Sequence, residues 1–78
     1  MTRDEIRIQV DKAFLKKIDK QLGGSSKADI GRSALTLLNW ALDEATKGRK
    51  ILSVSGEGTD MRELVMPELQ RAASLDEN

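Results

Sequence analysis

The side chains that most often carry out catalysis are absent from this sequence. It contains no Cys, His or Tyr. An active site would depend on Asp, Glu, Lys or Ser alone, and no grouping of these residues suggests acid–base or nucleophilic chemistry. The usual ligands of zinc are missing for the same reason. We therefore expect a protein that is not an enzyme and that holds no metal or cofactor.

The charged side chains are distributed unevenly, although the formal net charge is zero. Residues 1–50 carry eleven Lys and Arg against seven Asp and Glu, a net charge of +4, whereas residues 51–78 carry two against six, a net charge of −4. Such asymmetry is typical of a chain whose basic part meets nucleic acid and whose acidic part has another role. The alternative is a chance scatter of charges in a short chain.

A chain of 78 residues forms one small domain at most. Chains of this size often need disulfides, metals or a partner chain to complete a core. Because disulfides and zinc are excluded, we expect a homodimer. The N-terminus has no apolar signal region, and no apolar run approaches the roughly 20 residues that cross a bilayer. We therefore expect a cytoplasmic protein without a membrane partner.

The segment Ile6–Val10 alternates between apolar and polar side chains, with β-branched residues on one face and Arg7 and Gln9 on the other. This period of two predicts a short strand. No second strand follows nearby, so its backbone groups need a partner. The simplest partner is the same strand of another subunit, paired antiparallel about a two-fold axis.

Two helices are predicted after this strand. Asp11 is the candidate N-cap of a helix from about Lys12 to Leu22, which the Gly23-Gly24 pair ends. Ser26 is the candidate N-cap of a second helix from about Lys27 to Lys47. The predicted dimer core combines the apolar faces of the strand and both helices: Ile6, Ile8, Val10, Phe14, Ile18, Ile30, Ala34, Leu37 and Leu38.

Residues 49–78 are predicted to be a C-terminal extension. The segments Ile51–Ser55 and Glu63–Met66 flank turn-forming residues at 56–60, which predicts a β-hairpin. We expect Pro67 to end the second strand or to place it at a sheet edge. Residues 72–78 are expected to form a frayed, polar tail.

The turn Gly24-Ser25-Ser26-Lys27 and the helix start Ala28–Leu35 stand at a fixed spacing after the alternating segment. In this order the residues resemble the ribbon-helix-helix family of CopG, Arc and MetJ over about residues 4–46. The resemblance implies a mainly helical fold with a short N-terminal strand, in which two intertwined subunits pair their strands into an antiparallel ribbon. It also implies that residues 1–48 bind double-stranded DNA, with the ribbon in the major groove.

The resemblance further implies that Arg7 and Gln9 contact base edges, with Glu5 at the end of the ribbon. Arginine can donate two hydrogen bonds to guanine, and glutamine can pair twice with adenine. A carboxylate such as that of Glu5 repels phosphate unless it accepts a hydrogen bond from cytosine. In the simpler interpretation these three side chains belong to a solvated strand face.

A second DNA contact is implied at the start of the second helix, where unpaired backbone N–H groups and the helix dipole favour phosphate. The implied phosphate contacts are Ser25, Ser26, Lys27 and Ala28. Such contacts position a protein on DNA without reading its sequence. An ordinary helix cap is the simpler interpretation of the same residues.

Three functions remain open. The first, which we favour, is a sequence-specific DNA-binding protein, a nucleoid-associated transcriptional repressor or regulator whose dimers can assemble further on DNA. The second is an antitoxin whose acidic segment after Lys50 binds a toxin protein. The third is a dimerisation module that does not bind DNA. The alternating apolar segments after Lys50 favour an ordered hairpin, and thus the first function over the second.

Overall fold

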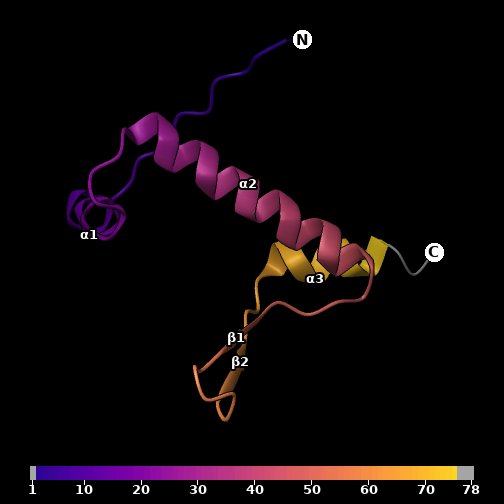
Figure 1. The fold of residues 1–78 in the computed structure, drawn as a ribbon. Coiled ribbons are helices and arrows are strands. Elements are labelled where there is room, and N and C mark those ends of the chain that lie inside the picture. The colour runs from indigo at the N-terminus through magenta and orange to yellow at the C-terminus, as the bar shows by residue number, and fades with distance from the viewer. Residues whose placement is uncertain (1, 76–78) are drawn as a thin grey trace. The chain divides into compact units, whose positions relative to one another are not determined.

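The computed structural model describes residues 2–75, which form three helices and a small two-stranded antiparallel sheet (Figure 1). The elements follow in the order α1 (Lys12–Leu22), α2 (Lys27–Thr46), β1 (Leu52–Val54), β2 (Met61–Glu63) and α3 (Pro67–Leu75). The chain divides into two compact units, which we call the N-terminal unit (Met1–Gly31) and the C-terminal unit (Arg32–Asn78). The prediction of a mainly helical chain is confirmed.

The strand predicted at Ile6–Val10 is not formed in this single chain. Residues 2–11 lead into α1 without regular secondary structure, and both strands in the described part of the chain follow the first two helices. A strand is held by hydrogen bonds to the backbone of a neighbouring strand. The described residues offer no such neighbour to this segment. The prediction of an N-terminal strand is therefore wrong for the isolated chain.

Helix α1 has the bounds predicted for it, because both of its ends are set by local residues. At its start, the Asp11 side chain accepts a hydrogen bond of 3.0 Å from the Phe14 N–H. At its end, Gly23 has a left-handed backbone with φ of 78°, and its N–H donates to the Lys20 carbonyl oxygen at 3.2 Å. These are a side-chain N-cap and a glycine C-cap, the two commonest ways to end a helix.

Helix α2 also begins where the sequence predicts, and it ends one residue earlier, at Thr46. The Ser26 Oγ accepts a hydrogen bond of 3.0 Å from the Asp29 N–H, which confirms Ser26 as the N-cap. At the other end the Gly48 N–H donates to the Ala45 carbonyl oxygen at 3.0 Å, with a φ of 77° at Gly48. The helix is thus bounded by a serine and a glycine.

The sheet of the C-terminal unit pairs Leu52 with Glu63 and Val54 with Met61. Its second strand lies earlier than the predicted segment Glu63–Met66, of which only Glu63 belongs to β2. The connecting loop explains this register, since the Ser55 N–H donates to the Asp60 carbonyl oxygen at 2.9 Å. That bond brings residue 61 opposite residue 54 and leaves residues 64–66 as a link to α3.

Pro67 begins a helix, so the expectation that it ends the second strand or places that strand at a sheet edge is wrong. Proline suits the first position of a helix because its missing N–H would have no intrahelical acceptor there. Glu68 adds a carboxylate to the first turn, where its negative charge interacts favourably with the positive end of the helix dipole. The predicted frayed tail is also wrong from Ala72 to Leu75, which lie in α3. The last three residues of the predicted tail, 76–78, lie outside the described residues.

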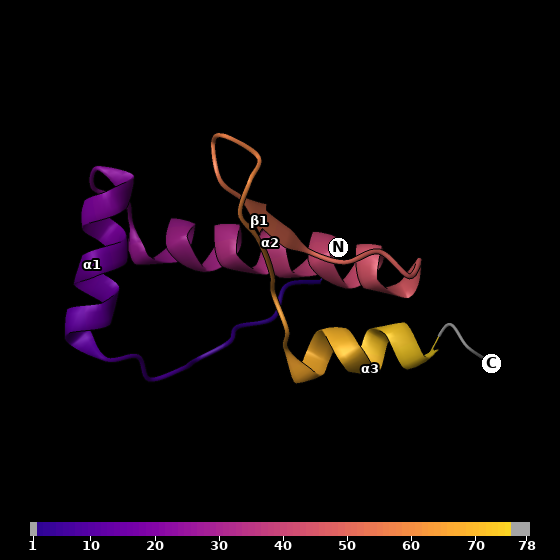
Figure 2. The ribbon, with the colours of Figure 1, turned by 90° about the horizontal axis from the view of Figure 1, so that it is seen from below.

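The core of the C-terminal unit lies between α2 and α3, which run side by side in both views (Figures 1 and 2). Its buried residues are Ala41 and Ala45 of α2 and Leu69 and Ala72 of α3. Because three of these four side chains are alanine, the two helices can approach closely. Leu42, Ile51 and Met66 pack against this cluster.

Candidate functional site

The segment before α1 presents its polar side chains to solvent. The side chains of Arg7 and Glu5 are 91% and 82% exposed, and they form an ion pair with 3.5 Å between Nη2 and Oε2. Gln9 is exposed as well. Since exposed ion pairs contribute little to stability, neither Arg7 nor Glu5 is held in one position by this contact. All three predicted base-contacting side chains are accessible to a ligand.

The apolar side chains of the same segment are exposed too. Ile6 and Ile8 are 67% and 75% exposed, and Phe14 of α1 is 54% exposed. No side chain among residues 2–31 is buried. Of the predicted dimer core, Ile18, Ile30 and Leu38 are half-buried, while the remaining members are exposed in this single chain: Ile6, Ile8, Val10, Phe14, Ala34 and Leu37.

The turn between α1 and α2 is closed by Asp19. The Asp19 carbonyl oxygen accepts from the Gly24 N–H at 3.1 Å, and its Oδ1 accepts from the Ser25 N–H at 2.7 Å. Gly24 has a φ of 93°, which residues with a side chain rarely adopt. The glycine and the aspartate together set the direction in which the chain enters α2.

The first turn of α2 keeps backbone donors available. Ser26 Oγ already accepts from the Asp29 N–H, and the Ser25 N–H is bound to Asp19. The N–H groups of Lys27 and Ala28 have no acceptor among residues 2–75. Of the four predicted phosphate contacts, Lys27 and Ala28 thus have unpaired N–H groups, while the hydroxyl groups of Ser25 and Ser26 can still donate.

A hollow of about 210 Å³ lies beside this turn, within the N-terminal unit. Three lysines from two helices line it, Lys12 and Lys16 of α1 and Lys27 of α2, together with Asp19. The complete lining is Lys12, Leu15, Lys16, Asp19, Ser25, Lys27 and Ile30. The structure therefore brings the predicted contacts Ser25 and Lys27 together with cationic side chains of α1.

Sequence reasoning missed Lys12, Lys16 and Asp19 as members of this site. The signal was present, because Lys12 and Lys16 are one helical turn apart and Asp19 follows in the next turn on the same side. What the sequence did not reveal is that the turn after Gly24 carries Lys27 to this side of α1. The lining is mostly apolar, and it includes three lysines and one serine, residue types whose side chains can bind an anion.

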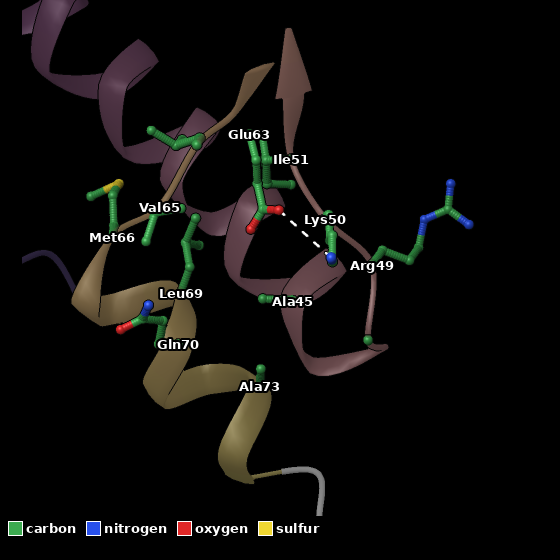
Figure 3. A pocket seen from close by; sticks show the side chains of 12 residues that line it. Ala45, Arg49, Lys50, Ile51, Glu63, Val65, Met66, Leu69, Gln70 and Ala73 are labelled. Carbon is green, nitrogen blue, oxygen red and sulfur yellow. Dashed lines mark ion pairs between the residues drawn. The ribbon is translucent and has the colours of Figure 1, made fainter. Parts of the chain in front are cut away.

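A second hollow lies in the C-terminal unit, between the end of α2, the sheet and α3 (Figure 3). Its walls are mainly apolar, with Ala45, Met66 and Leu69 among them. At its rim the Lys50 Nζ lies 3.7 Å from the Glu63 Oε1 (Figure 3). Its two cationic residues, Arg49 and Lys50, are each paired with a carboxylate, those of Glu44 and Glu63, so it offers less to an anion.

Within residues 2–75, no three acidic side chains gather where they could hold a metal ion. No helix in that range has the length and apolar character needed to span a bilayer.

No family model, no curated protein and no solved structure matches this chain.

Proposed function

We propose that this chain is a sequence-specific DNA-binding protein, a transcriptional repressor or regulator, that acts as a homodimer. The observation that carries the proposal is the convergence of Lys12, Lys16 and Lys27 on one hollow, beside the start of α2. Two helices thereby concentrate positive charge next to unpaired backbone N–H groups. This is the combination that binds a DNA phosphate.

The exposed apolar side chains of the N-terminal unit support a homodimer. Helix α1 has no buried residue, although Phe14, Leu15, Ile18 and Leu22 lie on one side of it. Ile6 and Ile8 precede it and are more exposed than any of these four side chains. A unit that buries no side chain among residues 2–31 has no stable core alone, so we infer that a second copy covers these residues.

In the proposed dimer, the two Ile6–Val10 segments pair antiparallel, as the ribbon-helix-helix resemblance implies. Pairing satisfies the backbone groups of a segment that the single chain leaves without a neighbour, and it turns Ile6, Ile8 and Val10 toward the helices. Arg7 and Gln9 then lie on the opposite face and meet base edges in the major groove. For this, Arg7 exchanges its exposed ion pair with Glu5 for hydrogen bonds to a base.

The hollow beside α1 would hold the phosphates that flank the ribbon. The N–H groups of Lys27 and Ala28 donate to the phosphate oxygens, and the lysine side chains neutralise the charge. Ser25 and Ser26 add hydroxyl donors at the same place. These contacts set affinity and register, whereas Arg7 and Gln9 supply specificity.

The proposal is tested by binding to a labelled random-sequence duplex over a range of salt concentrations. We compare the double variant Lys12→Ala/Lys16→Ala with Lys17→Ala/Lys20→Ala, which removes two charges from the same helix outside the hollow. The first variant should lose about ten-fold in affinity at low salt and show a flatter salt dependence. Equal losses in both variants would contradict a phosphate site in the hollow.

The C-terminal unit bears on the alternative function, toxin binding by an antitoxin. In the single chain, residues 51–75 already have a sheet and a helix packed on α2. This favours an appended module over a tail that folds only on a toxin. Co-purification of a stoichiometric second protein through the C-terminal unit would favour the antitoxin instead.

A further inference from the structure

Asp19 is the one polar residue of α1 that is not fully exposed. Its carboxylate is held in place by the short hydrogen bond of 2.7 Å from the Ser25 N–H, six residues further along the chain. Its backbone carbonyl oxygen also accepts from Gly24. One residue at the end of α1 thus fastens the turn that leads into α2.

The same carboxylate lies among the lysines of the hollow. It lines the hollow with Lys12, Lys16 and Lys27, so three positive charges stand against one negative charge. No ion pair within 4.0 Å joins Asp19 to any of these lysines in the described part of the chain. A phosphate beside these residues would be attracted by the charges of the three lysines and repelled by the charge of Asp19.

We propose that Asp19 is a positioning residue that also limits the affinity of the site for phosphate. As a hydrogen-bond acceptor it holds the turn before α2, which places Lys27 beside the hollow. As an anion it weakens the sequence-independent contact, which leaves a larger share of the binding free energy to base contacts. This inference rests on the DNA-binding function proposed above.

The two roles separate on substitution, because asparagine keeps an oxygen that can accept from the Ser25 N–H but carries no charge. Asp19→Asn should retain the thermal stability of the wild type and bind a random duplex about three- to ten-fold more tightly at low salt. Asp19→Ala, with the same change in charge, should melt at a lower temperature and bind more weakly than Asp19→Asn. A purely structural role for Asp19 predicts no tighter binding in any variant.

The matched control is Glu57→Gln, which makes the same change in net charge in the loop between β1 and β2. If Glu57→Gln tightened binding as much as Asp19→Asn, the effect would be one of net charge, and the proposal would be overturned. Equal affinity and equal melting temperature of Asp19→Ala and Asp19→Asn would also overturn it. Unfolding of Asp19→Ala beside a folded Asp19→Asn would support it, since only the acceptor oxygen distinguishes the two.

Hydrogen exchange at the Ser25 amide keeps this test distinct from that of the proposed function. The exchange needs no DNA, and it should be slow in the wild type and in Asp19→Asn but fast in Asp19→Ala. Slow exchange in Asp19→Ala would refute the positioning role. Failure of the wild type to bind any duplex at low salt would instead refute the DNA-binding function.

Discussion

Ser26 and Asp29 are joined by a hydrogen bond of 3.0 Å from the Asp29 N–H to the Ser26 Oγ, which caps α2 between two residues that line the hollow beside α1, Ser25 and Lys27. Ser26→Ala should therefore lower the free energy of unfolding by about 1 kcal/mol. Ser26→Asp retains a cap but places a carboxylate beside the proposed phosphate. It should match the wild type in urea unfolding yet lose DNA affinity, and unchanged DNA affinity in Ser26→Asp would argue against a phosphate there.

Arg7→Ala tests base recognition. A bidentate contact to one base contributes about 1–3 kcal/mol of discrimination, so the variant should lose that much on its selected target site and much less on random DNA. Arg49→Ala, which removes an arginine paired with Glu44 in the C-terminal unit, is the control. Fluorescence anisotropy with both duplexes measures the difference. Equal losses on target and random DNA would show that Arg7 contacts phosphate instead of a base, and no loss on either would show that it contacts neither.

Lys27→Ala tests the phosphate contact at the start of α2. Removing one phosphate-neutralising charge should weaken binding to target and random DNA alike and reduce the slope of log affinity against log salt by about 1. Binding measured at several salt concentrations gives this slope. A slope equal to that of the wild type would remove Lys27 from the phosphate-contacting residues.

The bounds of α1 and the start of α2 could be predicted because residues next to each boundary determine them. Asp11, Gly23 and Ser26 each act within three or four positions in the sequence. Helix α3 is not predicted when Pro67 is interpreted as the end of a strand, although proline at a first helical position followed by Glu68 also predicts a helix.

Interactions over longer separations explain the remaining differences. The register of β2 depends on the loop closed by Ser55, and the membership of Asp19 in the site depends on a turn that brings Ser25 back to it. The segment Ile6–Val10 has the alternation of a strand, but alternation does not supply the neighbouring strand that its backbone requires. The alternation in one chain therefore cannot show whether a second chain supplies the pairing strand.

Ile8→Lys tests the dimer. Ile8 is the middle residue of Ile6–Val10, so in a two-fold antiparallel pair it stands opposite its own copy, and the variant would place two positive charges side by side. Sedimentation should show a monomer or an unfolded chain. Val54→Lys, at an apolar side chain that is 55% exposed in the C-terminal unit, should remain dimeric. A dimer of unchanged affinity in Ile8→Lys would exclude this pairing.

Leu69→Ala tests the core of the C-terminal unit. Leu69 is 7% exposed between α2 and α3, so its truncation should lower the free energy of unfolding by about 2–4 kcal/mol at a fixed protein concentration. Leu75 is 70% exposed in the same helix, and Leu75→Ala should change this free energy by less than about 0.5 kcal/mol. Equal effects would mean that α3 does not pack on α2 in solution.

Selection from a random-sequence DNA pool with the purified wild-type protein, read by sequencing, tests the central proposal most directly. A dimer that reads the groove through two antiparallel Ile6–Val10 segments should enrich an inverted repeat whose half-sites change when Arg7 is replaced. A pool that remains random after repeated rounds at low salt would contradict sequence-specific DNA binding.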